Sequence, residues 1–569
     1  MRANDSPPGP PAVSTRTELR QLIETLLPGD SELSGFILQQ FPRIIESLRP
    51  GLSRLAKIEL LLDQAEHAQL LRHLRELGRH EQRTLAREIP DFSRERSQQV
   101  ELLGRQAEMN QLMLALRRDG WVLIVGEAGF GKTALMTRVL QLCKESSGVL
   151  WPHHFLSRME GETTRPQAVQ RSLAAQLEAL YPRFAEPGAA PEQRLHELLR
   201  RVVEKGLRPG SRLLLFIDGL DEADFSEVGN PLPLLLPPRL PERVTVVCTI
   251  RPSFRYARWL WEHTESQLVT KLMLDSPEQR GPSGACAAYL LAHRTEMKLS
   301  DPELTQAVSA CAGNLLSAVT LRQACRLGGS STKSALLSAL SQGGLRGLVQ
   351  VLWTQLPASS QTALGLCCAA RTALPVSLLG ELLGWRTARV EAFVQQAQPL
   401  LQLAPLARDV AVTEQGVRIA HSALREQLMV LVGQTTLYQS HRQLAGALCC
   451  WPPIEDALYG YRRYYALRNA LAQHSATESV AQIEQLTSNQ EYLSAACLEL
   501  GSAALAEELE QAAASATEVE VARTLAGLAR AVRLLLRWLT LDPGALPGLL
   551  YNLLRDVYKR QGHTALDGL

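Results

Sequence analysis

The sequence predicts a multidomain protein of the α/β and α classes, in which a core sheet of parallel strands is flanked by helical domains. Three apolar runs, at 122–125, 213–217 and 244–250, have the length and composition of strands buried on both faces of a parallel sheet. Most of the remaining chain repeats leucine and alanine at helical spacing, and only 5% of its residues are aromatic. A chain of 569 residues should form three to five domains, because single cores stop growing at roughly 250–300 residues.

Composition narrows the classes of protein that fit. The net charge is only +2, which gives no global electrostatic case for nucleic-acid binding. No run approaches the ~20 consecutive apolar residues of a transmembrane helix, and the Pro-rich start lacks the apolar core of a signal peptide. The ten cysteines form no C-x-x-C pair, so buried reduced thiols are expected, with disulfides or metal ligation as the alternative. We expect a cytoplasmic protein without a membrane span.

A phosphate-binding loop follows the first apolar run. The letters GEAGFGKTA at 126–134 contain the full G-x-x-x-x-G-K-T pattern, between the apolar run and a segment of helical spacing. Glycines let the backbone turn its N–H groups inward, and the helix start adds the positive end of its dipole. A chance glycine-rich turn is the alternative, but strand, loop and helix stand in the order that phosphate binding needs. The predicted binding residues are Gly126, Glu127, Ala128, Gly129, Phe130, Gly131, Lys132, Thr133 and Ala134.

The loop predicts binding of ATP or ADP together with Mg²⁺. Lys132 should reach the β- and γ-phosphates as a catalytic residue, and Thr133 should offer its hydroxyl to Mg²⁺. Asp218 stands at the carboxyl end of the second apolar run, where ligands bind in open α/β sheets, and suits a carboxylate that holds Mg²⁺. Either Asp221 or Glu222 could orient or deprotonate the attacking water.

The position of Asp221 and Glu222 distinguishes families of P-loop ATPases. Many P-loop motors place the catalytic glutamate directly after the Mg²⁺ aspartate, whereas Gly219 occupies that place here. GEAGFGKT before and DGLDE after a strand resemble the NACHT clade of STAND ATPases, the class that includes animal inflammasome-type receptors. The specific motifs of this resemblance cover residues 100–430. The resemblance implies a switch that is closed with ADP, opens on exchange for ATP and is reset by slow hydrolysis.

Two further motifs match this family at single positions. The letters LLGRQAE at 102–108 are similar to its hhGRxxE lead-in, which implies that Arg105 lines the adenine side of the site. A helix start without ligand contact is the alternative. The third apolar run ends in TIRP, where the resemblance implies that Thr249 and Arg251 sense the γ-phosphate. Arg251 could equally be a structural cap.

The next part of the chain, 275–335, is predicted to be a helical lid that closes over the nucleotide. The letters GNLLSA at 313–318 resemble the G-N-x-L-x-A segment of this domain. Related receptors often carry a proline that lies on the base, but Leu315 stands in its place. No adenine contact is therefore carried over to this residue.

Residues 340–432 fit a winged helix. Helical patches lead to strand-like segments at 400–403 and 410–413, and then to the letters RIAHSALRE at 418–426. In the family a histidine at such a helix start lies against the β-phosphate of bound ADP, which implies this role for His421. A histidine with a purely structural role is the alternative.

The flanks of this core are helical. Apolar positions at helical spacing between Pro-Gly breaks, including LRQL at 19–22, resemble the bacterial death-like, effector-associated modules of multidomain ATPases, which work by homotypic contact. A plain helical extension is the alternative. The letters DVYKRQ at 556–561 look like sequencing-adapter read-through, so a sensor such as a WD-type propeller would follow in the native protein. The predicted parts are a disordered tail (1–15), a death-like domain (16–78), a linker (79–98), an NTPase domain (99–274), the lid (275–335), the winged helix (340–432), a helical arm (435–555) and an artefactual or disordered end (556–569).

Together these features predict a bacterial signal-transducing ATPase that is switched by ADP and ATP. The expected partners are further copies of the chain on activation, an effector protein recruited by the N-terminal domain, and a trigger sensed by the C-terminal region. The family implies a role in antiphage conflict or regulated cell death. A DNA-acting AAA-type ATPase and a transcription regulator of the maltose-activator type are the alternatives.

Overall fold

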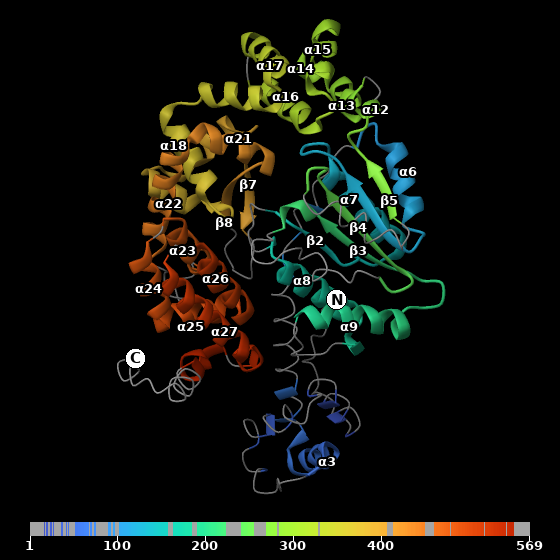
Figure 1. The fold of residues 1–569 in the computed structure, drawn as a ribbon, viewed down its shortest axis with the longest axis vertical. Coiled ribbons are helices and arrows are strands. Elements are labelled where there is room, and N and C mark those ends of the chain that lie inside the picture. The colour runs from blue at the N-terminus through green and yellow to red at the C-terminus, as the bar shows by residue number, and fades with distance from the viewer. Residues whose placement is uncertain are drawn as a thin grey trace, which may run out of the picture. The chain divides into compact units, whose positions relative to one another are not determined.

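The computed structural model of the chain contains two compact units, residues 1–89 with 178–185 and residues 90–177 with 186–569. Figure 1 shows their helices and strands. Between residues 16 and 96 the structure describes 52–67 and scattered positions. Beyond them it describes 102–157, 163–184, 191–223, 240–254, 269–281, 284–327, 330–406, 414–449, 460–477, 479–516, 518–541 and 543–550.

The larger unit begins with a five-stranded, fully parallel sheet in the order β2-β3-β4-β1-β5 (Figure 1). Every residue of β1, β3 and β4 is buried, which confirms the three strands expected from the apolar runs. Because the strands are parallel, their carboxyl ends meet at one edge, and the loops that follow β1, β3 and β4 lie together there. The strands are β1 (Gly120–Val125), β2 (His153–Phe155), β3 (Leu213–Asp218), β4 (Val244–Ile250) and β5 (Val269–Met273).

Two helices pack on one face of the sheet. Apolar side chains of α6 and α7, among them Leu112 and Val139, form one core with alternate residues of the strands, such as Ile124 and Phe216. This core holds the start of α7 against the end of β1. The helical elements of this part are α6 (Gln106–Ala115), α7 (Lys132–Ser147), α8 (Pro166–Leu180), α9 (Pro191–Arg201), the short turns η2 (Pro182–Phe184) and η4 (Leu220–Glu222), and the π-helical turn η3 (Val202–Gly206).

The predicted lid is helical throughout its described residues. Helix α15 begins with a capping box, in which Ser300 and Glu303 satisfy each other's backbone amides. Helix α17 runs past the predicted end of the lid and bends at Gly344, which has a φ of +57°. The helices are α12 (Pro277–Arg280), α13 (Ala285–Ala292), α14 (Arg294–Met297), α15 (Asp301–Cys311), α16 (Leu315–Leu327) and α17 (Ser330–Gln355).

The region predicted as a winged helix contains a second sheet, antiparallel and in the order β6-β8-β7. The strand expected at 400–403 is β7, whereas the expected strand at 410–413 lies outside the described residues. The strand paired with β7 is 414–419, so the residues 418 and 419 belong to a strand, and the following helix begins at Ser422. The elements are α18 (Ala358–Ala369), β6 (Leu374–Pro375), α19 (Val376–Leu383), α20 (Thr387–Gln396), β7 (Leu401–Leu406), β8 (Glu414–Ile419) and α21 (Ser422–Val432).

The C-terminal arm is a stack of helices that shares one core with this second sheet region. No helix in the described part of the chain is long and apolar enough to cross a membrane. The nine cysteines with described positions carry free thiols and are buried or half-buried. The elements are α22 (Gln434–Leu448), α23 (Gly460–Ala476), α24 (Val480–Ser488), α25 (Gln490–Leu500), α26 (Ser502–Ser515), α27 (Val519–Leu541) and η6 (Pro543–Ala545).

A buried ionic cluster joins the arm to two other parts of the larger unit. Arg171 Nη2 lies 2.6 Å from Glu507, and Arg371 Nη1 lies 2.6 Å from Glu508. Arg165 lies between the two glutamates, 3.7 Å from Glu507 and 3.6 Å from Glu508. Burial alone would raise the pKa of Glu508, but Arg371 and Arg165 hold it below its usual range. The cluster therefore ties α26 to the region of α8 and to the end of α18.

The smaller unit has a helical core of its own. Its best-described helix, α3 (Arg54–Gln64), is capped by the Ser53 hydroxyl, which accepts from the Ala56 amide at 3.3 Å. Arg16 and Arg20 form ion pairs with Glu59 on this helix. The other helices predicted between 16 and 78 fall largely outside the described residues, as do most of the linker and all of 556–569. The buried core residues are Leu19, Ile23, Leu27, Leu33, Phe36, Ile37, Phe41, Ile44, Ile58, Leu61, Leu62, Ala65, Leu70 and Leu74.

Candidate nucleotide site

The phosphate loop joins β1 directly to α7, as the sequence predicts. Gly129 and Gly131 have φ angles of +88° and +83°, in the left-handed region that glycine adopts without strain. Gly131 is the N-cap of α7. The first amides of this helix have no carbonyl partners within it, so they are available to an anion held by the loop.

The predicted Mg²⁺ ligands lie together. Thr133 donates a hydrogen bond of 2.7 Å to one oxygen of the Asp218 carboxylate. Thr249, at the end of the neighbouring strand β4, donates to the other oxygen at 2.7 Å and accepts from the Gly219 amide, also at 2.7 Å. Burial raises the pKa of Asp218 to about 6, although both hydroxyls work against this rise. Asp218 is therefore oriented by two hydroxyl groups and shielded from water.

Arg251 connects the acidic pair. Its backbone amide donates to Asp221 Oδ1 at 3.0 Å, and its Nε lies 2.8 Å from Asp221 Oδ2. Its Nη2 reaches Glu222 at a longer 3.5 Å. Arg251 Nη1 lies 3.4 Å from Glu426, on α21. The same guanidinium thus contacts both candidate catalytic acids and the helix that follows the second sheet.

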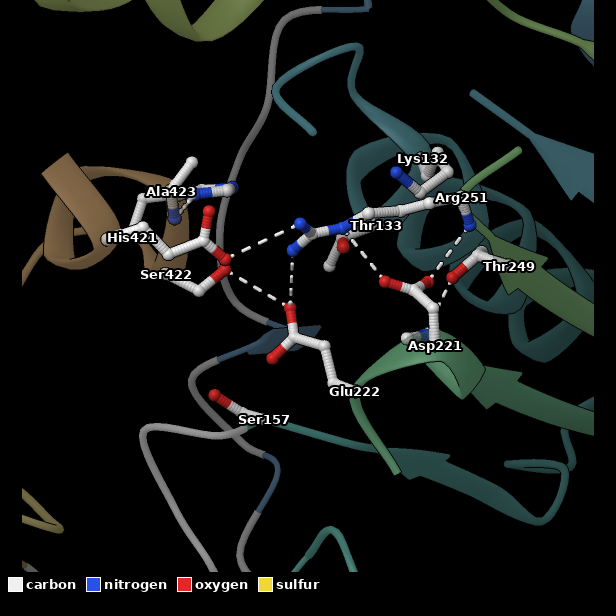
Figure 2. A network of polar contacts seen from close by, with 12 residues as sticks. Lys132, Thr133, Ser157, Asp221, Glu222, Thr249, Arg251, His421, Ser422 and Ala423 are labelled. Carbon is white, nitrogen blue, oxygen red and sulfur yellow. Dashed lines mark hydrogen bonds and ion pairs between the residues drawn. The ribbon is translucent and has the colours of Figure 1, made fainter. Parts of the chain in front are cut away.

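The start of α21 lies at this edge as well (Figure 2). Ser422 donates a hydrogen bond of 3.1 Å to Glu222. His421 caps the helix, since its Nδ1 accepts from the Ala423 amide at 3.1 Å. Burial, with the positive charges of Lys132 and Arg251, lowers the pKa of His421 to about 4. The ring is therefore neutral near pH 7 and carries its proton on Nε2, which is a hydrogen-bond donor.

Lys132 and Arg105 contact the loop itself. Lys132 Nζ donates to the carbonyls of Gly126 and Glu127, at 2.8 and 3.0 Å, and burial lowers its pKa. The buried guanidinium of Arg105 donates to the Phe130 carbonyl at 3.1 Å and to the Leu274 carbonyl at 3.3 Å. Arg105 also pairs with Glu108 at 2.9 Å. In this structure it braces the loop against the end of β5, and its predicted adenine contact stays a prediction.

Three residues at this edge were given no role by the sequence. Ser422 and Glu426 lie within the RIAHSALRE letters, but nothing in these letters indicates that they contact the ends of β3 and β4. Asn314 lies in the GN pair of the lid, and its side chain donates to the Ala128 carbonyl at 2.9 Å. Each contact joins residues far apart in the chain, so periodicity and spacing carry no signal for it.

The residues present suit a nucleotide with Mg²⁺. A hydroxyl and a carboxylate 2.7 Å apart are the oxygen ligands that Mg²⁺ prefers. The left-handed glycines and the start of α7 supply backbone donors for phosphate. A Mg²⁺ ion held here would supply positive charge that neutralises the charge developing on the phosphates. Thr133 and Asp218 would hold the ion, while Lys132 would donate to the phosphates.

The fold and the site define a P-loop NTPase. Residues 101–247 match the family described as AAA ATPase domain, and a search of curated proteins found no match. The chain is similar to the ORC1 protein of Aeropyrum pernix in complex with DNA, at 16% identity over 60% of this chain and 95% of that chain, with a TM-score of 0.30. It is also similar to the Drosophila ORC bound to DNA, at 14% identity over 57% and 95% of the two chains, with a TM-score of 0.27. Both TM-scores are low, so neither likeness bears on what this chain binds.

Proposed function

We propose that the protein is a nucleotide-switched, signal-transducing ATPase of the STAND type. It is closed with ADP and opens on exchange for ATP, and slow hydrolysis resets it. In the open state copies of the chain assemble, and the N-terminal helical unit recruits an effector, in the setting of conflict defence or regulated cell death. A trigger acts on the C-terminal region, and the protein works in the cytoplasm.

One observation carries this proposal: the start of α21 engages the residues that hydrolysis needs. Ser422 bonds Glu222 at 3.1 Å, and Glu426 lies 3.4 Å from Arg251. A helix in this position occupies the groups that would otherwise orient water or sense a γ-phosphate. This is the contact expected of a closed switch, because a ligand shifts a two-state equilibrium only through different contacts in the two states.

His421 supports an ADP-bound closed state. Its neutral ring offers an Nε2–H donor, and Lys132 is one of the charges that lower its pKa. A neutral donor beside the phosphate-binding lysine suits a β-phosphate oxygen. ADP would then contact both the loop and the cap of α21, and would hold the two together.

Of the two acids, Glu222 suits the role of general base better. Asp221 is held by both the backbone amide and the guanidinium of Arg251, so each of its oxygens is bonded to the residue that follows β4. Glu222 is held by Ser422 and, more loosely, by Arg251. Withdrawal of α21 would release Glu222 while Asp221 keeps Arg251 in place.

The test is to purify the full chain, denature it and identify any nucleotide that is released. We expect close to one ADP per chain, lost in Lys132→Ala and reduced in His421→Ala. Hydrolysis by the purified protein should be slow, and Glu222→Gln should abolish it. An empty site together with fast, constitutive turnover that DNA stimulates would overturn the switch and favour a DNA-acting AAA-type ATPase.

A further inference from the structure

Three consecutive carbonyls of the phosphate loop are held by donors from outside the loop. Asn314 Nδ2 donates to the Ala128 carbonyl at 2.9 Å, and the Leu316 amide donates to the Gly129 carbonyl at 3.0 Å. Arg105 Nη2 donates to the Phe130 carbonyl at 3.1 Å. We call these three donors the carbonyl clamp. Two of them belong to the lid segment, and the third comes from the lead-in to α6.

The clamp determines where the loop amides point. In a trans peptide the N–H points opposite to the C=O of the same unit. The bond from Asn314 to the Ala128 carbonyl therefore turns the Gly129 N–H away from the lid. The bond from Arg105 to the Phe130 carbonyl likewise turns the Gly131 N–H away from the Arg105 guanidinium. Loop amides that point away from these donors can contribute to a nest that binds phosphate oxygens.

The Asn314 side chain is itself held in one orientation. Its Oδ1 accepts from the Ser317 amide at 2.9 Å and from the Ser317 hydroxyl at 3.2 Å. Asn314 thereby caps the start of α16. Its Nδ2 is thereby directed to the loop. The packing is close: a Cβ added to Gly129 would lie 2.6 Å from Asn314 Oδ1. The side-chain amide of Asn314 therefore joins the first turn of α16 to the phosphate loop.

The two sides of the clamp differ in how they depend on the lid. Arg105 is buried in the NTPase part and also bonds the Leu274 carbonyl, so it does not depend on the lid. Asn314 and Leu316 lie at the start of α16 and leave the loop if the lid moves. The Ala128 and Gly129 carbonyls would then lose these partners.

We propose that Asn314 is a positioning residue of the nucleotide site, which holds the phosphate loop in its anion-binding form only while the lid is docked. Asn314 acts on the loop backbone and through it on the phosphates. Nucleotide binding and lid docking stabilise one another through this residue, because coupling between two equilibria is reciprocal. The inference rests on the nucleotide site of the proposed function and adds the device that links this site to the lid.

Asn314→Asp isolates the bond to the loop. The aspartate keeps an oxygen for the Ser317 amide, so α16 remains capped, but it places a carboxylate against the Ala128 carbonyl. We expect the affinity for ADP, measured by calorimetry on the full chain freed of nucleotide, to fall by about 10–100-fold. The melting temperature of the nucleotide-free protein should stay close to that of the wild type. In hydrogen exchange, ADP should protect α16 in the wild type and no longer in the variant.

Two further variants keep the result interpretable. Ser317→Ala removes the other side-chain partner of Asn314 without touching the loop, and should bind ADP within about twofold of the wild type. Asn314→Ser also keeps an oxygen for the cap but lacks the amide group that donates to the Ala128 carbonyl. It replaces Asn314→Asp if that protein does not fold. Wild-type affinity in the folded Asn314 variant, with affinity lost in Lys132→Ala, would overturn the inference and leave the nucleotide site intact. Absence of ADP binding by the wild type would instead overturn the proposed function.

Discussion

The Ser422 hydroxyl donates a hydrogen bond of 3.1 Å to the Glu222 carboxylate, although the two residues are 200 positions apart in the sequence. A side chain at the start of α21 is thereby bonded to an acid that follows β3. Withdrawal of α21 from the end of β3 would break this bond.

Ser422→Ala should loosen the closed state. Loss of a hydrogen bond to a charged, partly buried group should accelerate release of bound ADP by about 3–10-fold. Release of a fluorescent ADP analogue, followed by stopped flow, would measure this change. Ser440→Ala is a matched control, because the Ser440 hydroxyl bonds only a carbonyl one turn earlier in its own helix, at 2.9 Å. Equal release rates in the wild type and Ser422→Ala would contradict a role for the Ser422–Glu222 bond in holding the closed state.

Thr249→Val should shift the pH dependence of Mg²⁺ binding. Asp218 has a pKa raised to about 6 by burial, so Mg²⁺-dependent ATP binding should weaken as the pH falls through about 6. The Thr249 hydroxyl stabilises the ionised carboxylate, and its removal raises the pKa further. The acidic limb of the profile should therefore move to higher pH. Thr245→Val serves as the control, because Thr245 lies at the other end of β4 and its hydroxyl donates to the Arg118 carbonyl. A shift of the acidic limb in both variants, or in neither, would refute the role of Thr249 in setting the pKa of Asp218.

Acidification should weaken the docking of α21 through His421. Burial lowers the pKa of this ring to about 4, below its ordinary value of about 6.5. The released helix therefore takes up a proton that the docked helix excludes. Docking should be fully favoured above about 6.5 and should weaken as the pH falls towards 4. The rate of ADP release against pH would show this trend, which His421→Gln should flatten; an unchanged slope in the variant would assign the trend to another group.

Glu508→Gln should destabilise the protein through the ionic cluster. The change leaves Arg371 and Arg165 with one carboxylate fewer in a buried position, at a cost of roughly 3–5 kcal/mol. Chemical denaturation should show this loss, and limited proteolysis should show earlier release of the arm. Glu510→Gln on the same helix is the control, because Glu510 pairs with Arg533 inside the arm at a more exposed site and should cost below about 1 kcal/mol. Equal losses of stability in both variants would argue against the ionic cluster as the link between the arm and the rest of the larger unit.

The sheet core could be predicted from the sequence because its signals are local. The apolar runs coincide with β1, β3 and β4, and the phosphate loop lies where its glycines and lysine indicate. The strands β2 and β5 have no such signal. They lie at the two edges of the sheet, and their polar residues, such as His153 and Lys271, break the apolar pattern.

The site was only partly predictable for a physical reason. Asp218, Thr249 and Arg251 end neighbouring parallel strands, so their meeting follows from the rule that carboxyl ends share an edge. The contacts of Asn314 and Ser422 depend instead on how the helices after the sheet pack back onto that edge. Neither spacing nor periodicity encodes that packing, and a short polar residue at a helix start is common in any helical protein.

The order of the sheet also bears on how the protein is made. β1 lies between β4 and β5, so both neighbours of the strand that leads into the phosphate loop are synthesised after it. At roughly 5–20 residues each second, a ribosome takes on the order of ten seconds to pass from β1 to β5. Until β4 has been synthesised, neither backbone edge of β1 has its neighbouring strand of the final sheet. The strand that leads into the phosphate loop therefore acquires its second neighbour only once β5 has been synthesised.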